Sequence, residues 1–433
     1  MEAIRIGFLG LGTVGSGALA ALRAEPEALA RRAGAPLTPV RVAVRDPQRA
    51  RPVSLEGLAV TTDALAVATA PDVDIVVECI GGVGIAREAV TAALAAGKSV
   101  VTANKELIAK HGQELFELAD ARQVELAFEG SVAGGIPILG PLRASLTANR
   151  VRQVVGIVNG TTNYILSAMT RLGQPFEQLL AQAQAMGYAE SDPSADVDGH
   201  DAAYKLAILA MLAFDSTVSE EQVYREGIRR VTPTDIALAR SLGHRFKLLA
   251  IARDRGDKLE LRVHPTLVPE SHPLASVDDV YNAVFVEGAP VGQVMFFGRG
   301  AGGDPTGSAV AGDIVQVARD LLAGGRRSFA MAPARHRPVA TIDEAESSYY
   351  VRMWVVDRAG VLATIAGILG RWQVSIAQVL QTPNRGAGDG PSAELVWITH
   401  NTTEARLRGA LAEIAADEVC LALCNTFRCF GVD

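Results

Sequence analysis

Residues 4–24, IRIGFLGLGTVGSGALAALRA, decide the fold of the first part of the chain. The apolar run from Ile4 to Leu9 predicts a buried strand, GLGTVG follows it at once, and SGALAALRA predicts a helix. A GxGxxG pattern alone is a weak signal. Between a strand and a helix, it predicts a dinucleotide-binding Rossmann unit rather than a glycine turn in an unrelated α/β protein.

Five residues of this turn are the first predicted cofactor contacts. Gly10 allows the tight turn, Gly12 lets a pyrophosphate approach the backbone, and Gly15 lets the helix pack closely on the strand. The amides of Thr13 and Val14 then lie at the helix N-terminus, where they can face the phosphates.

The second expected strand, VRVAVRD at 40–46, addresses the choice between NAD and NADP. A carboxylate at the end of this strand suits the ribose 2′-hydroxyl of NAD, and an arginine suits the 2′-phosphate of NADP. Arg45 comes first, Asp46 follows, and Arg49 and Arg51 stand behind them. We favour NADP, and the adjacent Asp46 leaves NAD open.

Two further expected strands end at the same carboxyl edge, where doubly wound folds bind ligands. DIVVECIGG at 74–82 brings Gly81 to that edge, and KSVVTANKEL at 98–107 brings Thr102 and Lys105. Lys105 is either a surface residue or a clamp for substrate and cofactor, and its position just past the strand favours the clamp.

The stretch at 187–205, GYAESDPSADVDGHDAAYK, concentrates negative charge in a chain with a formal net charge of only −7. Asp201 and Lys205 share one face at the entrance to an apolar helix. A solvated acidic loop is the alternative, but Pro193 and Gly199 indicate a shaped loop, and we favour a pocket. Five carboxylates fall within twelve residues: Glu190, Asp192, Asp196, Asp198 and Asp201.

Length and composition restrict the class of protein. A chain of 433 residues is long enough for two or three domains. The 41 Lys and Arg are interspersed among 48 Asp and Glu without a basic stripe, which argues against a nucleic-acid partner. No apolar segment reaches about 18 uninterrupted residues, and the N-terminus lacks the pattern of a signal peptide. We therefore expect a cytoplasmic protein without a membrane span.

The four cysteines are expected to be buried thiols in a reducing compartment. The spacing of the three near the C-terminus lacks the paired CxxC of a structural zinc site. The four are Cys79, Cys420, Cys424 and Cys429.

Taken together, these motifs resemble the homoserine dehydrogenase family over nearly the whole chain. The segments that carry the resemblance occur in the family's order: GLGTVG (10–15), VAVRD (42–46), ECIGG (78–82), VVTANKEL (100–107), EGSVAGGIPI (129–138), GIVNGTTNYIL (156–166), GYAESDPSADVDGHDAAYKLAIL (187–209) and GRGAGGDPTGSAV (298–310).

The resemblance implies NAD(P)-dependent interconversion of L-aspartate 4-semialdehyde and L-homoserine, on the pathway to threonine, methionine and isoleucine. It also implies an α/β fold with a Rossmann domain, an α+β catalytic and dimerisation domain with an open mixed sheet, and a homodimer or homotetramer. There are two alternatives: a dehydrogenase for another small amino acid or semialdehyde, and an amino-acid sensor with a vestigial Rossmann unit.

Four residues take roles from the resemblance. Lys205 matches the proton donor and acceptor at the reacting oxygen, Lys105 matches the lysine beside cofactor and substrate, and Glu190 and Asp201 match substrate-binding carboxylates. Reduction of an aldehyde builds negative charge on its oxygen, so a cation or proton donor is needed there. Whether desolvation or the neighbouring carboxylates control the pKa of Lys205 is open.

Two further loops take roles from the resemblance. In EGSVAGGIPI, the main-chain oxygens of Glu129, Val132, Gly134 and Ile136 are implied to bind a monovalent cation, usually sodium, and carbonyls are suitable ligands for a hard cation. From its residues, NGTTNYIL at 159–166 is expected to be a polar loop that caps a helix, with Thr162 or Asn163 available as caps. The resemblance places this loop near the substrate pocket.

In GRGAGGDPTGSAV, the chain is implied to return to the nucleotide domain, with Gly302 touching the cofactor. The residues alone also suit an anion-binding helix start or a flexible turn. Gly307 stands where the family is expected to have alanine.

Residues 348–433 predict a βαββαβ order and resemble an ACT domain. Its first turn holds Asp357, Gly360 and Val361 as a candidate effector site, and the family implies L-threonine as effector. A purely structural oligomerisation module is the alternative. If the domain is regulatory, L-threonine inhibits the full chain but not a version ending near Ala330.

The expected domains are 1–130 (Rossmann, completed by about 298–325), 131–297 (catalytic), 326–347 (linker) and 348–433 (ACT).

Overall fold

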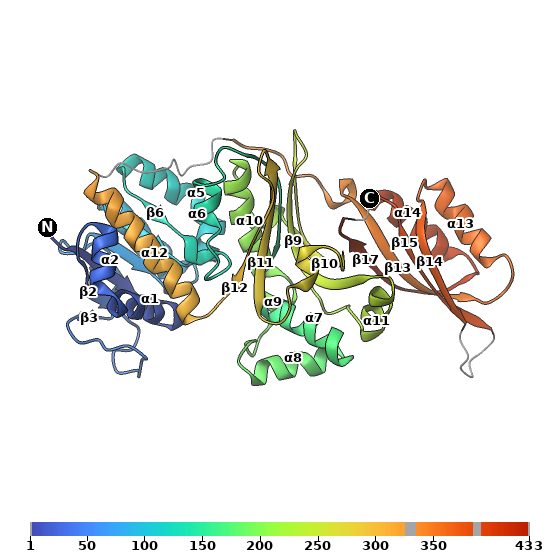
Figure 1. The fold of residues 1–433 in the computed structure, drawn as a ribbon, viewed down its shortest axis with the longest axis horizontal. Coiled ribbons are helices and arrows are strands. Elements are labelled where there is room, and N and C mark those ends of the chain that lie inside the picture. Colours follow the sequence, from blue (N-terminus) through green and yellow to red (C-terminus); the bar gives the residue numbers. More distant parts are fainter. Residues whose placement is uncertain (1, 325–334, 384–390, 432–433) are drawn as a thin grey trace.

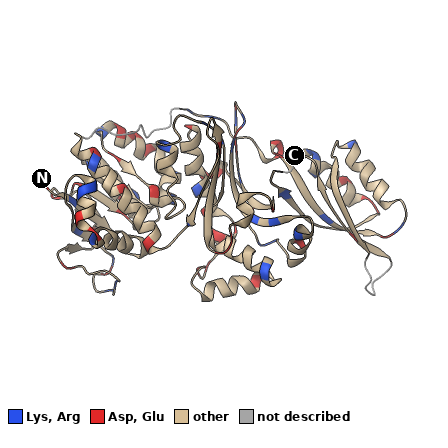
Figure 2. Cartoon of the chain, viewed as in Figure 1, with Lys and Arg blue, Asp and Glu red and all other residues tan. Residues whose placement is uncertain are grey.

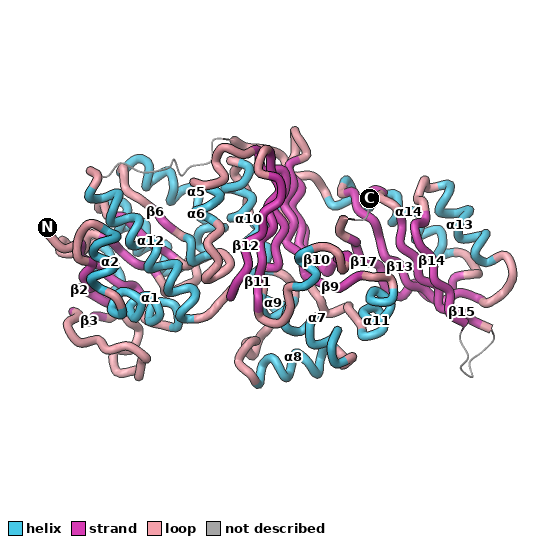
Figure 3. Tube along the Cα trace, viewed as in Figure 1, coloured by secondary structure: helices cyan, strands magenta, loops and turns pink. Residues whose placement is uncertain are grey.

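The computed structural model describes residues 2–324, 335–383 and 391–431. Three parts follow one another along its long axis, and the N-terminus lies at one end (Figure 1). Two sheets hold most of the strands, one in the first part and one that runs through the second and third parts (Figure 3).

The first sheet is the parallel sheet of a Rossmann domain. All six strands are parallel in the order β3-β2-β1-β4-β5-β6, which is the dinucleotide-binding order. The strands are β1 Ile4–Leu9, β2 Leu37–Ala43, β3 Ala59–Thr61, β4 Ile75–Glu78, β5 Ser99–Thr102 and β6 Leu126–Ala127.

Helices cover both faces of this sheet because its strand residues alternate between two cores. Ile6 and Phe8 of β1 pack into the core under α1 and α12, whereas Leu9 packs into the opposite core. One face carries α1 Thr13–Ala24, α2 Pro26–Ala33 and α12 Gly303–Leu322; the other carries α3 Ala64–Ala68, α4 Gly84–Ala95 and α5 Lys105–Arg122.

Helix α12 returns the chain to this domain and lies against α1 at very short range. A Cβ on Gly307 would come within 2.4 Å of the Gly17 carbonyl carbon, and a Cβ on Gly17 would come within 2.0 Å of the Gly303 oxygen. Gly307, which departs from the expected alanine, therefore lies where two helix backbones touch.

The second part is built on antiparallel strands. The path β12-β11-β7-β9-β10 is antiparallel throughout, and the short β8 pairs in parallel with β10. The strands are β7 Arg150–Ile157, β8 Tyr224–Arg225, β9 His244–Asp254, β10 Leu259–Pro269, β11 Tyr281–Ala289 and β12 Gly292–Arg299.

Helix α10 is the central helix of this part, since it contacts β7, β9, β10 and also α5 of the first domain. Eleven of its fifteen residues are buried, which explains the apolar run KLAILAMLAF. The helices are α6 Leu139–Arg143, α7 Gly160–Leu172, α8 Phe176–Ala185, α9 Ser194–Val197, α10 His200–Phe214 and α11 Pro233–Ser241, with the 3₁₀ helices η1 Glu129–Ser131, η2 Glu220–Gln222 and η3 Pro273–Ser276.

The third part has the βαββαβ element order that the sequence predicts. Its strands pair as β17-β13-β15-β14, with the small β16 beside β13. Two helices lie together against this sheet (Figure 1). The elements are η4 Ile342–Glu344, β13 Glu346–Val356, α13 Val361–Arg371, β14 Ile376–Pro383, β15 Ser392–Thr399, β16 Thr402–Thr403, α14 Glu404–Ala416 and β17 Cys420–Cys429.

The third part is joined to the second by a shared sheet, which the sequence did not predict. Strand β17 pairs in parallel with β10, so that Thr266 faces Arg428 and Leu267 faces Cys429. Within the stretch expected to be a linker, 326–347, Val339 forms a bridge with Leu259, and β13 begins at Glu346. Residues 325–334 lie outside the described residues.

No helix among the described residues is long and apolar enough to cross a membrane. Lysine and arginine are interspersed with aspartate and glutamate along all three parts in the view of Figure 2.

Candidate active site

A cavity of about 950 Å³ opens at the carboxyl edge of the parallel sheet. Of the predicted cofactor contacts, Gly10, Gly12, Thr13 and Arg45 line it. Nothing lies within 4 Å of the position that a Gly12 Cβ would take, so the backbone there is open to a ligand. The N-terminus of α1 also faces this space and favours a negatively charged group.

The side of the cavity that would receive the ribose is rich in arginine. Arg45, Asp46, Arg49 and Arg51 all line it. The Asp46 carboxylate accepts a hydrogen bond from the Gln48 amide at 2.9 Å, so one of its oxygens is already in use. The Arg51 guanidinium donates to main-chain oxygens of the same loop, whereas Arg45 and Arg49 are exposed.

Six other predicted contacts do not line this cavity: Val14, Gly15, Gly81, Thr102, Lys105 and Gly302.

Thr102 is fully buried and donates to Glu78 at 2.5 Å. The other oxygen of this carboxylate accepts from the amides of Ile80 and Gly81. The Glu78 carboxylate therefore holds the loop after β4 in place through these hydrogen bonds. Sequence reasoning did not identify this role. Gly302 is the N-cap of α12, and the next residue, Gly303, reaches the cavity.

Lys105, Asp201 and Lys205 form one cluster where α5 meets α10. Lys105 begins α5, and its Nζ lies 2.7 Å from Asp201 Oδ1. Lys205, one turn after Asp201 on α10, lies 2.7 Å from Asp201 Oδ2. The Asp201 and Lys205 side chains are 7% and 11% exposed, while that of Lys105 is 41% exposed. One carboxylate thus binds two lysines from two domains.

The two lysines have opposite pKa shifts. Burial lowers the pKa of Lys205, and the charge of Asp201 offsets this only in part because Lys105 repels it. Burial also opposes the charge of Lys105, but Asp201 outweighs it and raises the Lys105 pKa. Burial opposes the Asp201 charge as well, yet the two lysines hold its pKa well below the usual range. The site therefore has a fixed cation and a second lysine that loses its proton more readily.

The turn between β7 and α7 supports the cluster. Lys205 donates to the Val158 carbonyl oxygen at 2.7 Å, and the Asn159 side-chain amide donates to Asp201 Oδ2 at 2.9 Å. The expectation that Thr162 or Asn163 caps α7 is wrong, because the N-cap is Asn159, whose side-chain oxygen accepts from the Thr162 amide. The only sequence signal for this role was an asparagine before a glycine at a helix start.

The other acidic residues of the 187–205 stretch have different partners. Asp196 accepts from the Asn159 amide at 2.7 Å and so lies beside the cluster. Asp192 binds Ser194, and Asp198 forms an ion pair with Arg229 at 2.6 Å. Among the described residues, the exposed Glu190 has no side-chain partner, and only its carbonyl oxygen accepts a hydrogen bond, from Gln184.

The loop predicted to bind a cation has main-chain oxygens to offer. Within the described residues, the carbonyls of Val132, Gly134 and Ile136 accept no hydrogen bond, although all three residues are buried. Glu129 O accepts only a long one, at 3.4 Å, from the Val132 amide. Carbonyl oxygens without donors suit a hard cation. No set of three His, Cys, Asp or Glu side chains in the described ranges could hold a metal.

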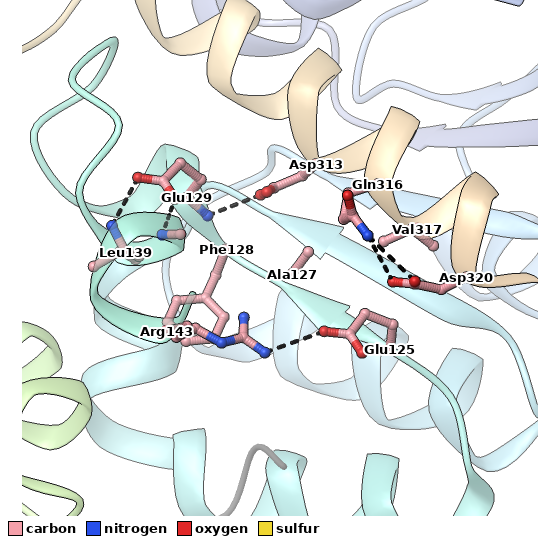
Figure 4. Close-up of a pocket in the computed structure, with 11 residues that line it drawn as sticks. Glu125, Ala127, Phe128, Glu129, Leu139, Arg143, Asp313, Gln316, Val317 and Asp320 are labelled. Carbon is pink, nitrogen blue, oxygen red and sulfur yellow. Dashed lines mark hydrogen bonds and ion pairs between the residues drawn. The ribbon is translucent and has the colours of Figure 1, made fainter. Parts of the chain in front are cut away.

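The Glu129 side chain anchors the start of the catalytic domain (Figure 4). Its carboxylate accepts from the amides of Ile138, Leu139 and Gly140, at 2.6, 2.9 and 2.5 Å. Its own amide donates to Asp313 of α12 at 2.8 Å. Burial, together with the nearby Glu129 charge, raises the pKa of Asp313 to about 8. Glu129, Leu139, Gly140 and Asp313 are among the residues that line a cavity of about 80 Å³.

Comparison with known proteins decides the family. The homoserine dehydrogenase family model matches residues 137–315, and the model for the NAD-binding domain of homoserine dehydrogenase matches residues 10–129. Homoserine dehydrogenase of Corynebacterium glutamicum is 45% identical over 99% of this chain and 96% of its own, and that of Neisseria gonorrhoeae is 43% identical over 96% of each chain.

The chain belongs to the homoserine dehydrogenase family.

Solved structures of homoserine dehydrogenases have the same fold. The crystal structure from Thiobacillus denitrificans is 42% identical, with a TM-score of 0.93 over 100% of this chain and 99% of that one. A hyperthermophilic archaeal homoserine dehydrogenase in complex with NADPH is 27% identical, with a TM-score of 0.63 over 73% of this chain and 98% of that one. As a homoserine dehydrogenase, the enzyme is an NAD(P)-dependent oxidoreductase.

The candidate effector turn lies at the start of α13. Gly360 has a φ of +93° and is the N-cap of α13, which begins at Val361. The Asp357 amide donates to the Pro391 carbonyl at 2.8 Å, and its carboxylate accepts from Gln381 at 3.5 Å. The match to the homoserine dehydrogenase family model ends at residue 315, before this turn, so it does not address the role of the turn.

Proposed function

We propose that the enzyme reduces L-aspartate 4-semialdehyde to L-homoserine, and oxidises homoserine in the reverse direction, on the route to threonine, methionine and isoleucine. The observation that carries the proposal is the Lys105–Asp201–Lys205 cluster, in which Asp201 and Lys205 are buried, in a chain whose nucleotide domain holds an open cavity. When bound, the nicotinamide cofactor supplies or accepts the hydride. The protein must then handle one proton and the charge on one oxygen.

Lys205 is the proton donor in reduction and the acceptor in oxidation. Its ammonium has three N–H groups, and two of them are used by the Val158 carbonyl and Asp201 Oδ2. Since the described residues provide no third acceptor, the third N–H is free for a substrate oxygen. In the neutral form, the two N–H groups can keep these acceptors, and the lone pair takes the third direction. The pKa lowered by burial favours this exchange.

Lys105 stabilises charge rather than moving a proton. Its raised pKa keeps it cationic, and its partly exposed ammonium lies on the other oxygen of Asp201. A fixed positive charge lowers the energy of an alkoxide that forms nearby. Glu190 is proposed to bind the substrate amino group, because it is an exposed carboxylate without a side-chain partner in the part of the chain that the structure describes.

NADP is the proposed cofactor, with NAD as the alternative. Arg45 and Arg49 reach the cavity with no carboxylate partner among the described residues, and a 2′-phosphate would supply one. The NADPH complex of the archaeal relative supports the same choice. Gly10, Gly12, Thr13, Val14 and Gly15 remain the proposed pyrophosphate contacts, and Gly81, Thr102 and Gly302 the proposed supports of the cofactor.

A sodium ion is proposed at the carbonyls of Glu129, Val132, Gly134 and Ile136. The lack of donors on the last three supports it. Bound there, the ion would neutralise carbonyl dipoles and stiffen the connection between the two domains. This role is structural, and the proton step at Lys205 does not depend on it.

Regulation and assembly are proposed from the third part of the chain. We infer that it is an ACT domain whose turn at Asp357, Gly360 and Val361 binds L-threonine, and that the enzyme is a homodimer or homotetramer. The ferredoxin-like element order supports the domain assignment. The four free cysteines fit the reducing interior of a cell, although only Cys429 is buried and Cys79, Cys420 and Cys424 are half-buried.

The test is an absorbance assay of cofactor reduction with L-homoserine, run with NADP and with NAD. We expect turnover with homoserine and a higher kcat/KM for NADP. Turnover that is faster with another amino alcohol, such as L-threonine, than with homoserine would contradict the substrate assignment.

A further inference from the structure

Asn159 contacts the cluster from outside, and its orientation can be derived from its partners. Its Oδ1 lies 2.9 Å from the Thr162 amide nitrogen, which can only donate. The oxygen must therefore face the helix, and the nitrogen faces the two carboxylates. This assignment follows from the hydrogen bonds, since oxygen and nitrogen of an amide are otherwise interchangeable.

The nitrogen of Asn159 has two N–H groups and two acceptors. The Asn159 Nδ2 atom lies 2.9 Å from Asp201 Oδ2 and 2.7 Å from Asp196 Oδ1. Asn159 is 5% exposed, so water does not replace these bonds easily. A neutral amide thus separates two carboxylates that would otherwise repel each other next to the lysines.

The bond to Asp201 is on the oxygen that Lys205 uses. Lys205 and Asn159 both donate to Oδ2, whereas Lys105 takes Oδ1. A donor on a carboxylate stabilises its charge and makes it a weaker acceptor for other donors. Asn159 therefore limits how strongly Asp201 holds the Lys205 proton, and it fixes the plane of the Asp201 carboxylate.

We propose that Asn159 is a positioning residue for the hydride-transfer reaction: its side-chain amide orients Asp201 and thereby sets the direction and the acidity of Lys205. The inference rests on the proposed function. It assigns to the β7–α7 turn a part in the proton step beyond capping a helix.

The decisive variant is Asn159→Ser. Serine caps a helix about as well as asparagine, but it is too short to reach Asp201 and Asp196. We expect kcat for homoserine oxidation to fall about 10- to 100-fold, the range seen when a group that orients a functional ligand is removed. The KM for NADP should change little, because Asn159 does not line the cofactor cavity.

The pH profile separates positioning from capping. Without the Asn159 donor, Asp201 holds the Lys205 proton more strongly, which raises the pKa of Lys205. The acidic limb of the pH profile for homoserine oxidation then moves to higher pH. A merely structural role would lower kcat without moving that limb. Asn159→Asp, which keeps the size and the cap but removes the donor at neutral pH, is the second variant and should also lose activity.

An Asn159→Ser enzyme with kcat within about twofold of wild type, or with reduced kcat and an unmoved limb, would overturn the inference. Wild-type enzyme that fails to oxidise homoserine would instead overturn the proposed function, so the two failures are distinguishable.

Discussion

At the scale of single residues, the site depends on a difference between two lysines that bind one carboxylate. Lys105 and Lys205 lie at the same distance from Asp201, 2.7 Å. They differ in burial, and burial decides which of them releases a proton, because the charged form is penalised where water is excluded. Asp201 is thus shared by a lysine whose pKa is raised and by a lysine whose pKa is lowered, and the second is the proposed proton carrier.

A pH profile tests this assignment. In the proposed mechanism, oxidation of homoserine needs neutral Lys205, so log kcat should rise with pH and level off above the Lys205 pKa. Because burial lowers that pKa, the midpoint should lie below 10.5. The measurement is kcat with saturating homoserine across the alkaline range. A midpoint above 10.5 would show that Asp201, and not burial, controls the proton of Lys205.

At the scale of elements, the nucleotide domain depends on the close packing of α1 on α12. Gly17 and Gly307 allow the two backbones to touch, as the short Cβ distances show. Overpacking of such a contact costs about 1–3 kcal/mol, which exceeds the roughly 1 kcal/mol that alanine gains over glycine in a helix. We therefore expect that Gly307→Ala lowers the melting temperature.

Gly312 provides the matched control. It lies in the same helix, and nothing is within 4 Å of the position that its Cβ would take. Gly312→Ala should raise the melting temperature by the propensity gain alone. Thermal unfolding of both variants is the measurement. If the Gly307→Ala and Gly312→Ala enzymes had the same melting temperature, α1 and α12 would be able to move apart without a loss of stability.

At the scale of the whole molecule, the third part is fixed to the catalytic domain and is not attached by a linker alone. Asp235 of α11 is fully buried and accepts from Arg352, Tyr350 and Asn425 of the third part, at 2.6, 3.2 and 2.7 Å. Phe246 and Phe427 also pack across the junction, with ring centroids 4.9 Å apart.

This junction changes how regulation should be tested. A chain ending near Ala330 would lose the cover of β10, so loss of L-threonine inhibition in it would have two explanations. Substitutions at Asp357 or Gly360 in the full chain are cleaner, since they leave the junction intact.

Asp235→Ala should destabilise the full chain by about 3–5 kcal/mol, because it leaves the Arg352 charge buried without its main partner. Arg352 is also paired with Glu394 at 3.2 Å, which favours the lower end of that range. Arg358→Ala, which breaks an exposed ion pair with Glu418, should cost at most about 1 kcal/mol. Urea unfolding of the two variants measures the difference. Equal stability would indicate that the junction is not held by Asp235.

Local patterns predicted much of this fold and site. The strand–GLGTVG–helix order indicated the parallel sheet, and the i, i+4 spacing placed Asp201 and Lys205 on one face. Features that join distant segments could not be read from such patterns. Glu78 supports Thr102, 24 residues away, Asn159 reaches Asp201 across 42 residues, and β10 pairs with β17 only in the folded chain. Each of these contacts depends on which surfaces meet in the folded protein. The local spacing of residue types along the sequence does not contain that information.

The most direct test of the central claim is the kcat of Lys205→Met for homoserine oxidation. Methionine keeps most of the length of the side chain but removes its proton and charge. We expect kcat to fall at least about 10²-fold, the lower range for loss of general acid–base catalysis, with NADP binding by fluorescence titration unchanged. A variant that keeps kcat within about tenfold of wild type would show that the proton moves elsewhere, and the assignment of the Lys105–Asp201–Lys205 cluster would be wrong.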